Sequence, residues 1–102
     1  MSNITQARKA LLTRIREGDG KTSPAQRHAA FDNTGLAKPV NMLIDKVVKH
    51  AYRITDEDID TARASGLSED QLFEMVVCAA IGQASRQYEG ALGVLEAATM
   101  EE

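Results

Sequence analysis

Apolar residues recur every three or four positions along most of this chain, and this spacing is typical of amphipathic helices rather than strands. The pattern predicts five helices, over residues 3–17, 24–33, 39–51, 56–64 and 68–98. No segment alternates convincingly between apolar and polar positions. The predicted fold class is therefore all-α. We expect residues 1–102 to form a single all-helical domain that begins with a basic helix and loop over residues 1–20.

Capping residues indicate where three of these helices begin. Ser23 is followed three residues later by Gln26, and Ser68 is followed by Gln71 at the same spacing, which is the order of a capping box. Thr55 precedes three acidic residues, and the helix dipole favours negative charge in a first turn. These signals fall between the apolar segments, so they support the same division into helices.

The last predicted helix is apolar on nearly every side between residues 72 and 81. A helix of this kind is buried on more than one side, and in so short a chain we expect the second side to contact another subunit. Gly82, Gly90 and Gly93 are unusual inside a helix because glycine is a poor helix former. They either permit close helix packing or, at Gly82, mark a break after which Ser85 caps a new helix.

Charge is distributed unevenly along the chain, whose net charge is −3. Residues 1–53 contain ten Lys or Arg and four Asp or Glu, whereas residues 54–102 contain two and eleven. This polarity suits attraction between the halves, within one chain or between subunits, and equally suits two solvated faces. The basic first helix raises the hypothesis of a nucleic-acid accessory protein. It lacks interleaved aromatic residues and a helix-turn-helix spacing, so we expect no nucleic-acid partner.

The sequence lacks the motifs of several classes of function. The single cysteine excludes an internal disulfide and a zinc site built on cysteine pairs. The two histidines lie on separate predicted helices, and neither an HExxH motif nor a glycine-rich phosphate loop is present. We therefore expect no metal and no cofactor. The N-terminus lacks the apolar core of a signal peptide, and no apolar run is long enough to span a bilayer. We expect a cytoplasmic protein without a membrane partner.

Two residues of the last helix are candidates for chemistry. Cys78 lies among Val, Ala and Ile, where burial makes a thiol inert, so we interpret it as a packing residue. Glu74 is flanked by Phe73 and Met75, and a carboxylate is rarely buried without a partner. Either it faces solvent, which the periodicity favours, or a partner holds it in a pocket. A desolvated carboxylate of this kind could act as a general base.

Arg86 and Glu89 are three residues apart and can meet on one face of a helix. They form either a surface ion pair of little energetic value or a substrate-binding pair near Glu74. The sequence leaves these alternatives open.

The C-terminal half resembles the alkylhydroperoxidase D-like, carboxymuconolactone decarboxylase superfamily. The similarity lies in the run HAYRITDEDIDTARASGLSEDQLFEMVVCAAIGQASRQYEGAL and covers about residues 47–95. Three features occur in the same order as in the superfamily. They are a TDED turn at residues 55–58, an ASGLSED segment at residues 64–70, and the pair Phe73-Glu74, which opens a long Ala-rich helix. The resemblance implies an all-helical fold and a homo-oligomer, usually built of trimers.

Redox members of that superfamily carry a glutamate, two cysteines separated by two residues, and a histidine. The resemblance implies that Glu74 matches the relay glutamate, whereas Arg86, Glu89 and Gly93 stand where the cysteines and the histidine belong. A dithiol mechanism is therefore not possible within this chain. Cys78, one turn after Glu74, is not the displaced cysteine.

Two hypotheses about function follow from these observations. The first is a non-redox member of the superfamily that acts as a structural or small-molecule-binding oligomer, with a pocket near Glu74, Arg86 and Glu89. The second is a lyase or isomerase in which Glu74 is the catalytic base and Arg86 binds a substrate carboxylate. Whether the protein is an enzyme is not decided by its sequence.

Overall fold

The computed structural model describes residues 2–100 and is helical almost throughout. Within these residues it contains no strand, which confirms the all-α class and the number of long helices. The elements in chain order are α1 (Ser2–Glu17), α2 (Pro24–Asp32), α3 (Val40–His50), the 3-10 turn η1 (Ala51–Arg53), α4 (Asp56–Arg63) and α5 (Glu69–Met100).

The predicted capping residues begin the helices that they precede. Ser23 and Gln26 form a reciprocal capping box at the start of α2, and Thr55 accepts a hydrogen bond from the first turn of α4. At α5 the Ser68 hydroxyl accepts from the Gln71 amide, and the Gln71 side chain accepts from the Ser68 amide. These local bonds satisfy amide groups that have no partner inside a helix, which explains why the boundaries could be predicted.

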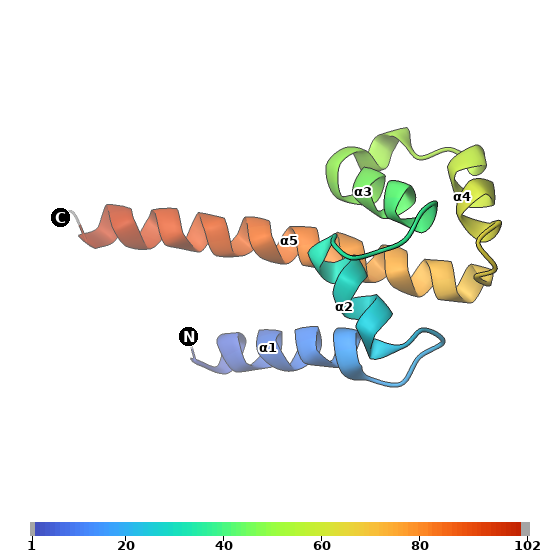
Figure 1. The fold of residues 1–102 in the computed structure, drawn as a ribbon. Coiled ribbons are helices and arrows are strands. Elements are labelled where there is room, and N and C mark those ends of the chain that lie inside the picture. Colours follow the sequence, from blue (N-terminus) through green and yellow to red (C-terminus); the bar gives the residue numbers. More distant parts are fainter. Residues whose placement is uncertain (1, 101–102) are drawn as a thin grey trace.

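The hydrophobic core lies where α2, α3 and α4 pack against the first half of α5 (Figure 1). Its buried residues come from all four helices: Ala30, Phe31, Val40, Leu43, Ile44, Val47, Ala62, Leu72, Met75, Cys78 and Ala79. Cys78 belongs to this core, so its interpretation as a packing residue is confirmed.

Gly82 of α5 lies directly against the backbone of α2. A side chain at this position would collide with the backbone carbonyl of Phe31, the residue before the end of α2. The helix continues without a break through Gly82, so the alternative of a new helix capped by Ser85 is wrong. Gly82 permits close helix packing, as the other alternative predicted, whereas a side chain at Gly90 or Gly93 would meet no other atom of the described residues.

The second half of α5 projects beyond the core, with α1 running beside it (Figure 1). The chain measures 54 × 29 × 20 Å and has a radius of gyration of 15.7 Å, against about 13 Å for a compact domain of this length. All side chains from residue 86 to residue 99 are exposed. The expectation of burial on two sides between residues 72 and 81 is only partly met, because Phe73 and Ala80 are exposed.

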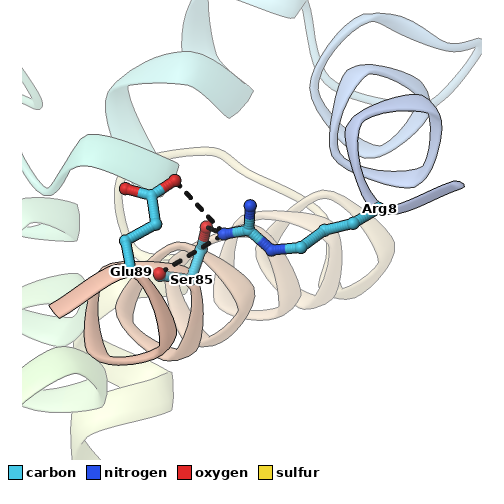
Figure 2. A network of polar contacts seen from close by, with 3 residues as sticks. All are labelled: Arg8, Ser85 and Glu89. Carbon is cyan, nitrogen blue, oxygen red and sulfur yellow. Dashed lines mark hydrogen bonds and ion pairs between the residues drawn. The ribbon is translucent and has the colours of Figure 1, made fainter. Parts of the chain in front are cut away.

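Arg8 links α1 to the start of this projecting half (Figure 2). Its Nη2 donates to the Ser85 hydroxyl at 2.5 Å and to the Glu89 carboxylate at 3.2 Å. The guanidinium also lies 4.8 Å from the centre of the Tyr88 ring.

Across the part of the chain that the structure describes, no helix has the length and apolarity needed to cross a membrane.

Candidate functional site

Glu74 is held by the loop that joins α1 to α2. Its Oε2 accepts a hydrogen bond from the Lys21 amide at 2.5 Å. Its Oε1 accepts from the Thr22 amide at 3.3 Å and from the Thr22 hydroxyl at 3.2 Å. Gly20 lies so close to this carboxylate that a side chain at position 20 would collide with the carboxylate oxygen. The carboxylate is half-buried and partnered, so the solvent-facing alternative that periodicity favoured is wrong.

The pKa of the Glu74 carboxyl is lowered from its ordinary value. Desolvation is the largest single influence and acts to raise it, but the hydrogen bonds from Lys21 and Thr22 and the charge of Arg27 together outweigh desolvation. Glu74 is therefore ionised at neutral pH. A carboxylate with a lowered pKa is a weak proton acceptor, which is unfavourable for a general base.

Arg27 is a buried cation that sequence reasoning did not identify. Only 4 % of the residue is exposed, and its Nη1 donates to the Ile15 carbonyl at the end of α1 at 3.3 Å. Its Nε–H is buried and has no hydrogen-bond partner. Its position in the helix could have indicated that it is buried. Ala30 and Phe31 follow it by three and four residues, so they share its helix face, and both are buried.

Cys78 lies close to Arg27 and Glu74. Burial raises the pKa of the Cys78 thiol, the Glu74 charge raises it further, and the Arg27 charge opposes both effects. Its Sγ lies 3.8 Å from the Ile15 carbonyl oxygen. A protonated, buried thiol is a poor nucleophile, so the structure agrees with a packing role.

These groups line one cavity of about 350 Å³ between α1, the following loop, α2 and α5. Arg27 and Cys78 are its buried members, whereas Asp19, Lys21 and Phe73 are exposed. The complete lining is Arg14, Ile15, Asp19, Gly20, Lys21, Arg27, Phe73, Glu74, Val77 and Cys78.

Arg86 and Glu89 lie outside this cavity and take different partners. Arg86 Nη1 donates to the Phe31 carbonyl at 2.8 Å and so binds the C-terminal end of α2. Glu89 pairs with Arg8 of α1 at 3.2 Å (Figure 2). The structure thus places Arg86 and Glu89 one and two turns beyond Gly82, where each joins α5 to another helix. It does not bring them together with Glu74.

Among the described residues, no cluster of three or more His, Cys, Asp or Glu side chains could hold a metal ion. Comparisons of the chain with known protein families, with curated proteins and with solved structures give no match. The resemblance to the alkylhydroperoxidase D-like superfamily therefore depends on the residues of the C-terminal half alone.

Proposed function

We propose that this protein is a non-redox relative of the alkylhydroperoxidase D-like superfamily that acts as a self-associating helical subunit. The observation that carries the proposal is the uncovered apolar surface of α1 and of the second half of α5. In α5, the longest helix, 14 of the 32 residues, from residue 86 to residue 99, lie outside the hydrophobic core and are exposed. A helix without tertiary packing is only marginally stable in water, so this arrangement calls for a partner.

The exposed part of α5 carries a regular seam. Tyr88, Leu92, Leu95 and Thr99 follow one another at intervals of four, three and four residues, and all four are exposed. This is the spacing of positions that face a partner helix in a coiled coil. Leu92 and Leu95, together with Glu96 and Thr99, also border a surface hollow of about 380 Å³.

The first helix contributes a second uncovered apolar strip. Ile4 and Leu11 are seven residues apart on one face of α1, and both are more than half exposed. The periodicity that predicted this helix included them with Leu12 and Ile15, yet only the latter two pack against the core. The apolar face of α1 is therefore longer than the surface that its own chain covers.

A second copy of this chain is the occupant that fits these surfaces. The seam would pack against the equivalent seam of each partner subunit, as the core positions of helices do in a symmetric coiled coil. The distribution of charge also favours attraction between copies. Helix α1 contains four Lys or Arg and one Glu, whereas the last 49 residues contain eleven Asp or Glu and two Arg. The resemblance implies that this assembly is based on trimers.

Sedimentation equilibrium tests this proposal directly. We expect wild-type protein to have a mass that is a multiple of the 11.1-kDa protomer, and Leu95→Asp to sediment as a folded monomer. Val94→Asp is the matched control, because Val94 is 71 % exposed and Leu95 63 %, but Val94 lies on the opposite side of α5 from the seam. Wild-type monomer at all concentrations, or equal effects of both substitutions, would refute the proposal.

The lyase or isomerase alternative finds less support in the geometry. Glu74 is engaged by three donors and its pKa is lowered, and Arg86 is occupied at the end of α2. A redox role would need a second thiol, and the chain has one cysteine. We expect no peroxidase turnover with a dithiol reductant, and measurable turnover would overturn this part of the proposal.

A further inference from the structure

Arg27 has more hydrogen-bonding capacity than the protein uses. A guanidinium group has five N–H donors, and the hydrogen bond to the Ile15 carbonyl is the one that the structure records for this side chain. The Nε–H is buried without a partner. Within the described residues, no carboxylate lies within ion-pair distance of Arg27.

Such a cation is costly to bury. Arginine is almost never fully buried unless it is paired, and an unpaired buried charge loses its hydration without compensation. Glu74 is near enough to interact electrostatically with Arg27, because the charge of Arg27 contributes to lowering the pKa of Glu74. Its two oxygens, however, accept hydrogen bonds from Lys21 and Thr22 instead.

The cavity beside Arg27 combines positive charge with an apolar wall. Its charged members are three cations and two anions, so an anion is favoured overall. The cations are Arg14, Lys21 and Arg27. The apolar wall consists of Ile15, Phe73, Val77 and Cys78.

We propose that this cavity binds a small organic carboxylate that has an apolar body. The carboxylate pairs with the Arg27 guanidinium, whose planar donors match the two oxygens of a carboxylate, and the body packs against Phe73 and Val77. A volume of about 350 Å³ is at the small end of the range of ligand pockets, which suits an aromatic or medium-chain monocarboxylate. The site lies within one chain, so this inference is independent of self-association.

The test is a ¹H–¹⁵N NMR titration of the wild-type protein with benzoate and octanoate. Benzamide and octanamide serve as uncharged probes of the same shape. We expect saturable shifts of the Lys21 and Thr22 amides and of the Arg27 Nε–H signal with both carboxylates. Because one charge-assisted pair is removed, we expect binding of the amides to be at least about tenfold weaker. The absence of a saturable shift at millimolar carboxylate, or equal binding of the amides, would overturn the proposal.

Two variants locate the binding site. Arg27→Gln removes the charge, and Arg63→Gln is its matched control because Arg63 is an exposed arginine on α4 outside the cavity. We expect carboxylate binding to weaken at least about tenfold in the first and to stay unchanged in the second. Val77→Phe narrows the cavity and leaves Arg27 in place, so it gives an independent readout if Arg27→Gln does not fold. Undiminished binding in Val77→Phe or in folded Arg27→Gln would refute the assignment.

Discussion

The two halves of α5 have opposite environments within one continuous helix. Residues 69–85 pack against α2, α3, α4 and the loop that follows α1, whereas all side chains from residue 86 to residue 99 are exposed. The first half contains a buried thiol, a clamped carboxylate and a glycine at a backbone contact. The second half contains two glycines with open space around them and the exposed apolar side chains of the seam, Tyr88, Leu92 and Leu95. Both halves have a helix-forming sequence, but the hydrophobic core covers only the first half. The second half is joined to the rest of its chain by the polar contacts of Arg86 and Glu89.

Gly82→Ala should show the largest difference between the halves. The added methyl group would meet the Phe31 carbonyl, which is backbone and cannot rotate away, so α2 and α5 must separate. We expect the free energy of unfolding to fall by about 3 kcal/mol, at the upper end for overpacking, as measured by urea denaturation. An unchanged denaturation midpoint would contradict the close contact.

Glu74→Gln should weaken the attachment of the loop between α1 and α2 to the first half of α5. We expect a loss of about 1–2 kcal/mol at neutral pH, because glutamine has one side-chain oxygen in place of two. It cannot accept from both Lys21 and Thr22, and the hydrogen bonds that remain are no longer charge-assisted. Since the folded-state pKa of Glu74 lies below its ordinary value of 4.5, the stabilisation is fully present above pH 4.5. It is lost as pH falls through the lowered pKa.

The wild-type and Glu74→Gln stability curves should therefore converge as the solution is acidified below pH 4.5. Urea denaturation at several pH values measures this convergence. A difference that stays constant from neutral to acidic pH would show that the loop is not held by the charge of Glu74.

Arg86→Ala tests the boundary between the halves. The substitution removes the donor that satisfies the Phe31 carbonyl at the end of α2, and we expect a loss of about 1 kcal/mol. Gln87→Ala, one residue further along and exposed, is the control and should change stability little. Equal effects would mean that the Arg86 contact contributes no stability of its own.

Gly90→Ala should give the smallest effect and the opposite sign to Gly82→Ala. No atom lies within contact distance of a side chain at this position, so alanine gains helix propensity without a clash. We expect a stabilisation of about 0.5–1 kcal/mol, read from the thermal midpoint. Destabilisation would show that another subunit packs tightly against Gly90.

Sequence reasoning succeeded where the determining contacts are local. The caps at Ser23, Thr55 and Ser68 depend on partners three residues away, and the helical period of Leu72, Met75 and Ala79 is enough to place the core face of α5. The all-α class follows from these signals together.

The candidate site depended on distant contacts, and there the sequence was a poor guide. Glu74 is partnered by residues 52 and 53 positions away, and no periodicity reveals such partners. Arg86 and Glu89 have the right spacing to pair, yet each finds a partner on another helix. Arg27 was missed because an arginine among alanines is expected to face solvent, whereas here it is enclosed by the end of α1.

Hydrogen exchange at two protein concentrations tests the central claim, that a second copy covers the second half of α5. At high concentration we expect the amides of residues 86–99 to be protected. On dilution below the dissociation constant they should lose protection, while residues 69–85 stay protected because their own chain covers them. Exchange of residues 86–99 that does not change with protein concentration, whether fast or slow, would contradict the claim.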